Sequence, residues 1–211
     1  MNWQAWWPQV LRVCKEQAVI VLFSAQPFTT DLINSNRTCF RYELIWHKTL
    51  AAGWLDANRR PLRAHENILI FARKPIGSTY NVQKEPGHKP YTTRHIGPVP
   101  HYGKQYWESV SQSLSGERYP RSVLLFSNRK TSKNSQHRYL HPTQKPLELM
   151  QWLVRGYSNP GETVLDPFMG SGTTGAACLA TGRKFIGIES DYSYYKVARA
   201  RLCRSSLKQA V

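Results

Sequence analysis

Two glycines and two carboxylates near the end of the chain have the types and spacing of a nucleoside-binding site. The segment VLDPFMGSGTTGAACLATGRKFIGIES contains all four, namely Asp166, Gly170, Gly172 and Glu189. Glycines let a backbone approach a ligand closely, and a helix that begins near Thr173 offers free N–H groups to a carboxylate. Glu189 lies 23 residues after Asp166, where the second strand of a βαβ unit ends. We expect its carboxylate to accept hydrogen bonds from two ribose hydroxyls.

A dinucleotide-binding loop is the alternative interpretation of the same glycines. Gly170, Gly172 and Gly175 have the spacing G-x-G-x-x-G. They follow Asp-Pro-Phe, however, whereas the strand of the dinucleotide fingerprint runs directly into its first glycine. An NAD-binding oxidoreductase is therefore a distant alternative, which predicts binding of a nicotinamide cofactor.

Two motifs resemble those of the amino-methyltransferases that modify adenine N6 or cytosine N4 in DNA. DPFxGSGTT is intact at residues 166–174 and HPTQKP at residues 141–146, in the order of the β group of that family. Four upstream blocks extend the resemblance: LFSAQPF, YELIWHK, RPLRAHENILIFARK and RYPRSVLLF. The resemblance implies an α/β fold with a Rossmann-like sheet, mostly parallel with one antiparallel strand. It leaves open whether adenine or cytosine is the target, which site is read and whether a nuclease partner exists.

The resemblance also implies that the chain binds S-adenosylmethionine. In the family the glycine loop lines the methionine end of the cofactor, the acidic residue after the next strand holds the ribose, and the HPTQKP segment closes the pocket. The residues that match these positions are Asp166, Phe168, Gly170, Ser171, Gly172, Thr173, Glu189, Thr143 and Lys145. Simpler interpretations exist for two of them, since Lys145 could be a surface lysine at a helix start and Asp166 a turn former. We expect no metal site.

The turn that carries methyl transfer in this family is not present in the sequence. That turn reads [Asp/Asn/Ser]-Pro-Pro-[Tyr/Phe/Trp], and none of the 13 prolines here is adjacent to another. The resemblance implies that the turn belongs upstream of Met1, on a strand between those predicted at residues 163–166 and 18–23. We therefore name no catalytic residue and expect an N-terminally incomplete domain that is inactive alone. A shortened reading frame, a segment or subunit that supplies the strand, and a poorly folding chain are the explanations. The rival function is a non-catalytic remnant that binds DNA or cofactor.

The elements that must position these residues alternate between helix and strand, which predicts a single α/β domain over residues 1–211. Trp3, Trp6, Trp7 and Val10 recur at helical spacing and indicate a buried helix face, not a base-stacking surface. The apolar run at residues 18–23 is typical of a buried parallel strand. The other predicted helices are 30–35, 146–157, 174 to about 181, and 191–202; the other strands are 42–46, 67–71, 122–126, 163–166 and 185–188.

Strong positive charge predicts a polyanionic partner, for which DNA is the natural candidate. The chain has 29 Lys and Arg residues against 13 Asp and Glu residues, a net charge of +16. Residues 73–145 hold 13 basic and three acidic residues, and the Gly- and Pro-rich stretch 75–116 predicts a loop or small lobe that recognises the DNA target. A surface that serves only solubility is the alternative. The predicted DNA-binding residues are Arg73, Lys74, Lys84, Lys89, Arg94, Lys104, Arg118, Arg121, Arg129 and Lys130.

Composition narrows the class further. No apolar run reaches the length of a membrane span, and the first residues lack the pattern of a signal peptide. The four cysteines are far apart without a CxxC pair, so they indicate reduced packing residues. We expect a cytoplasmic protein of a bacterial or phage-infected cell, with no membrane partner.

Overall fold

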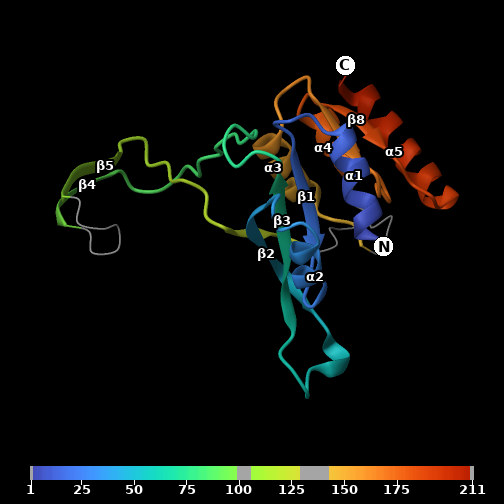
Figure 1. Ribbon diagram of the computed structural model, residues 1–211, viewed down its shortest axis with the longest axis horizontal. Helices are drawn as coiled ribbons and strands as arrows, with labels where there is room; N and C mark the ends of the chain where they lie inside the picture. Colours follow the sequence, from blue (N-terminus) through green and yellow to red (C-terminus); the bar gives the residue numbers. More distant parts are fainter. Residues whose placement is uncertain (1, 99–105, 129–142, 210–211) are drawn as a thin grey trace. The chain divides into compact units, whose positions relative to one another are not determined.

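The chain has two compact units, of which the larger contains a four-stranded sheet (Figure 1). The computed structural model describes residues 2–98, 106–128 and 143–209. The larger unit comprises Met1–Asn81 and Ser122–Val211, and the smaller unit comprises Val82–Arg121. Along the chain, the smaller unit is therefore an insertion into the larger one.

The four-stranded sheet is mixed, with the order β1-β3-β2-β6. Its central strand β3 runs antiparallel to both β1 and β2, while β2 and β6 are parallel. The strand bounds are β1 Val19–Ser24, β2 Phe40–Ala52, β3 Arg63–Ala72 and β6 Val123–Phe126. A 3-10 helix, Trp54–Asp56, lies between β2 and β3.

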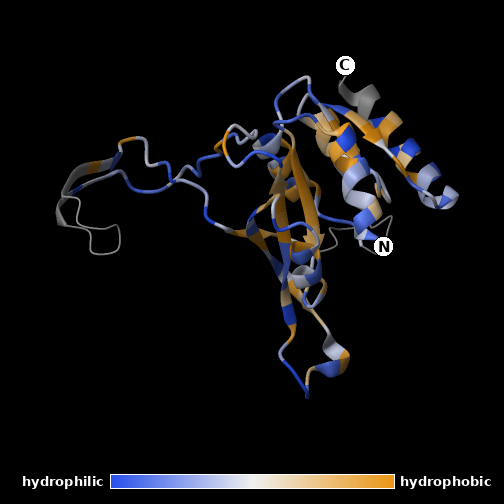
Figure 2. Cartoon of the chain, in the orientation of Figure 1, coloured by the Kyte–Doolittle hydropathy of each residue, from blue (hydrophilic) through white to orange (hydrophobic). Residues whose placement is uncertain are grey.

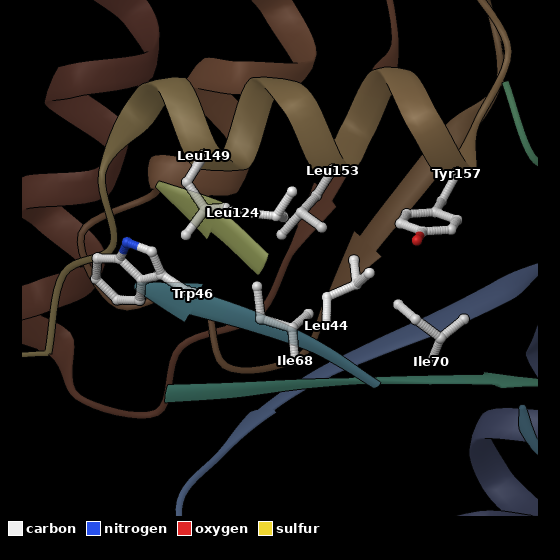
Figure 3. Close-up of a cluster of buried hydrophobic side chains, with 8 residues drawn as sticks. All are labelled: Leu44, Trp46, Ile68, Ile70, Leu124, Leu149, Leu153 and Tyr157. Atoms are coloured by element: carbon white, nitrogen blue, oxygen red, sulfur yellow. The ribbon is translucent and has the colours of Figure 1, made fainter. Parts of the chain in front are cut away.

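Alternate side chains of strand β3 lie in two separate hydrophobic cores. Ile68 and Ile70 pack against α3 (Leu147–Tyr157) through Leu149 and Leu153 (Figure 3). The intervening Leu69 and Phe71 face the other way and belong to a core with Trp7 of α1 (Trp3–Val13) and Leu32 of α2 (Phe28–Ser35). The period of two along a strand thus explains why the sheet is covered on both faces. Figure 2 shows the same concentration of hydrophobic residues in the central strands.

The tryptophan stripe is a core feature, as its spacing predicted. Trp7 is buried and donates a hydrogen bond of 2.8 Å from its ring nitrogen to the hydroxyl of Ser35. Trp3 and Trp6 are partly buried against the same cluster. These rings are therefore largely occupied in packing the sheet.

The prediction of a mostly parallel sheet is wrong for the described strands. Two of the three pairings in the four-stranded sheet are antiparallel, because β3 lies between β1 and β2 and runs opposite to both. The run at residues 18–23, interpreted as a parallel strand, pairs antiparallel with β3 from Val19 opposite Ala72 to Ser24 opposite Asn67. Burial on both faces makes a strand uniformly apolar whatever its direction, so the apolar run alone could not decide.

A second, parallel sheet carries the predicted βαβ unit. Strand β7 (Thr163–Asp166) leads through α4 (Thr173–Ala180) to β8 (Lys184–Gly187), and α5 (Tyr192–Gln209) follows. Val164 and Phe185 pack against buried Ala177 and Cys178 of α4. Val154 of α3 belongs to the same cluster, so α3 packs against both sheets.

One edge each of β1 and β7 has no partner in the described part of the chain. There, β1 pairs only with β3 and β7 only with β8.

None of the helices in the described residues combines the length and apolar character that a membrane span requires.

The smaller unit contains a two-stranded antiparallel ribbon. Strand β4 (Tyr91–Pro98) pairs with β5 (Tyr106–Ser113), and an isolated bridge joins Glu85 to Arg118. The guanidinium of Arg118 lies 4.4 Å from the ring centre of Tyr91. The unit overlaps most of the stretch 75–116 that the sequence predicts as a loop or small lobe, but it begins and ends later.

Candidate functional site

The glycine loop at the carboxyl end of β7 is held by the carboxylate of Asp166. One oxygen of Asp166 accepts a hydrogen bond of 3.0 Å from the backbone N–H of Phe168, and the other accepts one of 2.5 Å from the hydroxyl of Thr174. Both contacts are local, so they tie the start of the loop to the first turn of α4. They agree with the interpretation of Asp166 as a turn former, and its predicted contact with a cofactor stays a prediction.

Gly170 and Gly172 give the loop its shape. Their φ angles are 50° and 73°, in the left-handed region that glycine adopts without strain. A Cβ on Gly172 would lie 3.1 Å from the Cβ of Ala198 in α5, closer than ordinary van der Waals contact. The loop therefore needs glycine at position 172 both for backbone conformation and for space.

Helix α4 begins directly after this loop, and no side-chain hydrogen bond caps its amino-terminal end. Gly172 occupies the N-cap position, and the first turn of the helix contains no acidic residue. The helix dipole leaves a partial positive charge at this end. An anionic group of a ligand is therefore the natural partner for the first turn.

Glu189 joins the loop after β8 to the loop after β7. One carboxylate oxygen accepts a hydrogen bond of 2.9 Å from the backbone N–H of Gly170, and the other accepts one of 2.9 Å from that of Asp191. The backbones of the two loops are also bonded directly, from Met169 N–H to Ile188 C=O at 3.0 Å. Each carboxylate oxygen has a second lone pair, so these contacts leave acceptor capacity for sugar hydroxyls.

Gln144, which the sequence did not single out, contacts the glycine loop from the described part of the HPTQKP segment. Its side-chain oxygen accepts a hydrogen bond of 3.0 Å from the hydroxyl of Ser171. His141 and Pro142 lie outside the described residues. Thr143 is exposed, and its predicted role stays a prediction.

Lys145 pairs with Glu66 at the start of β3. Its ammonium nitrogen lies 2.9 Å from one oxygen of Glu66, and the other oxygen lies 2.5 Å from the ammonium of Lys48. Burial raises the pKa of Glu66, but the hydrogen bonds and charges of Lys48 and Lys145 outweigh it and leave the pKa below its ordinary value. Lys145 thus forms an ion pair with Glu66 of the sheet. The predicted contact of Lys145 with a cofactor carboxylate stays a prediction.

Arg201 of α5 is a further residue at the loop that sequence patterns missed. One guanidinium nitrogen donates to the hydroxyl of Thr173 at 2.9 Å and to the carbonyl oxygen of Ser171 at 3.3 Å. Burial lowers the pKa of this guanidinium. No motif marks an arginine in the middle of a basic helix, so only the packing of α5 reveals it.

Phe168 and Thr173 are the remaining predicted loop residues. The ring of Phe168 is 57% exposed beside the loop, and Thr173 is buried at the start of α4. An exposed aromatic ring at the glycine loop offers a surface on which a ligand can pack, and the predicted contact of Phe168 with a cofactor stays a prediction.

The predicted DNA-binding residues fall into three groups. Five belong to the smaller unit, namely Lys84, Lys89, Arg94, Arg118 and Arg121. Arg73 and Lys74 follow β3 in the larger unit, where Lys74 forms an ion pair with Glu16. Lys104, Arg129 and Lys130 lie outside the described residues.

A glycine loop between a strand and a helix, tied to a carboxylate after the next strand, defines an α/β protein of the nucleoside-binding class. Residues 2–200 match the family model N6_N4_Mtase, described as DNA methylase. The chain therefore belongs to this family of DNA methylases.

Curated relatives match the chain over different lengths. The Type II methyltransferase M.HpaI of Haemophilus parainfluenzae is 28% identical over 201 residues, which are 93% of this chain and 57% of that protein. The DNA adenine methyltransferase YhdJ of Escherichia coli is 56% identical over 62 residues, or 29% of this chain and 21% of the relative. The chain thus spans less than two thirds of the length of each of these two relatives.

Solved structures share the fold. The complex of M1.HpyAVI with SAM has a TM-score of 0.65 at 26% identity, and the match covers 94% of this chain and 80% of that one. The PvuII cytosine-N4-specific DNA methyltransferase has a TM-score of 0.66 at 17% identity, with coverage of 95% and 69%. The second likeness shows the fold alone.

Proposed function

We propose that this chain binds S-adenosylmethionine at the carboxyl ends of β7 and β8, as part of an enzyme that methylates the exocyclic amino group of adenine or cytosine in DNA. One observation carries the proposal: the carboxylate of Glu189 is hydrogen-bonded to Gly170 beside the uncapped amino-terminal end of α4. That pair offers acceptors for ribose hydroxyls and a positive helix end for a carboxylate, which are the two polar ends of this cofactor.

The residues of the loop fit such a ligand in charge and in space. The first turn of α4 contains no acidic residue of its own, and its nearest carboxylate, that of Asp166, is hydrogen-bonded to Phe168 and Thr174. Gly170 and Gly172 place no side chain over the loop. Thr143 and Lys145 belong to the segment that Gln144 joins to Ser171, and we propose that this segment borders the methionine end.

The chemistry needs one further group that this sequence does not contain. The cofactor supplies a methyl group on a sulfonium sulfur. An exocyclic base amine is a poor nucleophile, because its lone pair is delocalised into the ring. Enzyme groups that accept hydrogen bonds from the amine N–H groups increase its reactivity. In the family these acceptors belong to the [Asp/Asn/Ser]-Pro-Pro-[Tyr/Phe/Trp] turn, whose aromatic ring stacks on the flipped-out base. We therefore propose that residues 1–211 alone bind cofactor and DNA without transferring the methyl group.

We further propose that a strand bearing this turn pairs with β1 and β7. Within the described residues each of these strands has one edge with no strand beside it. Side chains of both strands belong to hydrophobic clusters that also contain residues of α3, Val21 and Phe23 of β1 in one and Val164 of β7 in the other. A strand between them would join the two sheets into one and satisfy backbone groups that are otherwise left to water. A longer form of this polypeptide and a separate subunit are both possible sources.

Calorimetric titration and radiolabelled methyl transfer test the proposal together. We expect S-adenosylmethionine to bind to residues 1–211 and NAD not to bind. We expect no label to reach unmethylated DNA. Absence of cofactor binding refutes the cofactor site, and binding of NAD instead favours the oxidoreductase alternative. Methyl transfer by this chain alone refutes the need for the missing turn.

A non-catalytic protein that binds DNA or cofactor is the second candidate, favoured by the absent turn. This candidate has the same binding site as the first. The two differ in whether the protein methylates DNA once the missing strand is supplied. A form of the protein that carries a strand with the turn, either on a longer chain or on a second one, methylates DNA under the first proposal and stays inactive under the second.

A further inference from the structure

Helix α5 lies against the glycine loop along one helical face. Ala198, Arg201 and Leu202 are three and four residues apart, so they share that face. Ala198 is fully buried, and its Cβ would lie 3.1 Å from a Cβ on Gly172. A Cβ on Gly175 would lie 2.7 Å from a methyl carbon of Leu202. The two glycines therefore allow α5 to approach the loop and α4 more closely than any other residue type would.

At this close approach the guanidinium of Arg201 reaches the two residues on either side of Gly172. A single guanidinium nitrogen carries two hydrogens, and it donates to the Ser171 carbonyl at 3.3 Å and to the Thr173 hydroxyl at 2.9 Å. Ser171 directs its own hydroxyl to Gln144 at 3.0 Å. Arg201 thus ties the peptide group between Ser171 and Gly172 to the side chain of Thr173, on either side of the left-handed turn at Gly172.

We propose that Arg201 is a positioning residue, which holds the glycine loop in the conformation that receives the amino-acid part of the cofactor. The inference rests on the proposed function. A loop with two left-handed glycines has many conformations when it is not held, and ordering it on binding lowers affinity. Arg201 restrains Ser171 and Thr173 at the methionine end of the proposed site, whereas the proposed ribose contact belongs to Glu189.

This division predicts that Arg201 contributes more to binding of the amino-acid part of the cofactor than to binding of its nucleoside. We compare Arg201→Met, which keeps the apolar stem, with Arg199→Met, which removes an exposed arginine from the same helix. The ligands are S-adenosylmethionine and 5′-methylthioadenosine, which has the same nucleoside but lacks the amino-acid carboxylate. Loss of a hydrogen bond from a charged donor corresponds to about tenfold or more in an equilibrium constant.

We expect Arg201→Met to weaken S-adenosylmethionine binding by about tenfold and to leave 5′-methylthioadenosine binding within about twofold. Arg201→Lys should restore part of the affinity, because an ammonium supplies the same donors on a stem one bond shorter. Arg199→Met should bind both ligands as the unchanged chain does. Unchanged affinity in Arg201→Met, or an equal loss for both ligands, overturns the inference.

Amide hydrogen exchange of the chain without ligand separates this inference from the proposed function. We expect the amides of residues 170–173 to exchange faster in Arg201→Met than in Arg199→Met, while those of β3 stay equally protected in both. Equal exchange of the loop in the two variants overturns the positioning role. If the unchanged chain binds neither ligand, the proposed function fails, and the exchange measurement still decides whether Arg201 holds the loop.

Discussion

The carboxylate of Glu189 and the backbone N–H of Gly170, 19 residues apart in sequence, lie 2.9 Å apart across two loops. This hydrogen bond holds the glycine loop after β7 to the loop after β8. The same carboxylate is also the acceptor that we assign to the ribose. One side chain therefore couples the shape of the loop to recognition of the sugar.

Glu189→Gln should weaken S-adenosylmethionine binding by about tenfold or more, because the amide nitrogen cannot accept the hydrogen bonds that a carboxylate oxygen accepts. The measurement is calorimetric titration of the cofactor. Glu162→Gln is the matched control, since Glu162 also accepts a hydrogen bond from a backbone N–H, that of Asn159, away from the loop. Equal affinity in the two variants would remove Glu189 from the binding site.

Gly172→Ala should destabilise the fold by about 3 kcal/mol, because it combines backbone strain at φ 73° with a contact of 3.1 Å to Ala198. Gly161→Ala isolates the strain, as its φ is 80° and nothing lies within 4 Å of the added Cβ. That variant should cost about 1 kcal/mol. Urea denaturation measures both, and equal midpoints would contradict the close packing of α5 on the loop.

The βαβ unit and the tryptophan helix were predictable because each has a strong local signal. Glycines flanked by an apolar strand and an apolar helix define where β7, α4 and β8 begin and end, and the tryptophans recur with helical period. The direction of β1 was not predictable, because strand pairing depends on residues about 50 positions away in β3. The stretch that contains the ribbon β4–β5 was interpreted as a loop or small lobe without strands, since its sequence lacks a sustained apolar period.

The partners of the site residues were harder to predict than their positions. Lys145 meets Glu66 across 79 residues, and Arg201 reaches Ser171 across 30. Contacts at such separations arise from tertiary packing and leave no spacing pattern in the sequence. Motif reasoning therefore found the loop and its acidic residue but missed Gln144 and Arg201, which act on the loop from other elements.

Glu66→Gln should destabilise the protein at neutral pH by about 3 kcal/mol, because it leaves the buried Lys48 without its counter-charge. The pKa of Glu66 is lowered in the folded chain, so its contribution to stability is present above the ordinary glutamate pKa. That contribution is lost as pH falls through the lowered folded value. Unfolding free energies measured from neutral to acidic pH should therefore fall less steeply for Glu66→Gln than for the unchanged chain.

Glu16→Gln is the control for this ion cluster. Glu16 pairs with Lys74 on an exposed surface, where solvent screens the charges. Its substitution should leave the free energy of unfolding at neutral pH unchanged within error. If Glu66→Gln behaves in the same way, the cluster of Lys48, Glu66 and Lys145 contributes nothing to the fold.

DNA binding through the smaller unit should show a strong dependence on salt. If the protein neutralises about six phosphates, the logarithm of the affinity falls with the logarithm of salt concentration at a slope of roughly −5. Fluorescence anisotropy with a labelled duplex measures this slope, and a slope near zero would remove the DNA-binding assignment altogether.

Substitution of three exposed basic residues of the smaller unit, Lys84, Lys89 and Arg94, by glutamine should make that slope less negative by about 3, because each lost phosphate contact removes about one released counterion. The control replaces three exposed basic residues of the larger unit, Arg12, Lys15 and Arg37, and so lowers the net charge equally. General attraction of a +16 chain to DNA predicts the same slope for both triple variants. Phosphate contacts made by the smaller unit predict a difference, because only contacts at the interface release counterions. Equal slopes would therefore assign the DNA affinity to net charge and not to the ribbon unit.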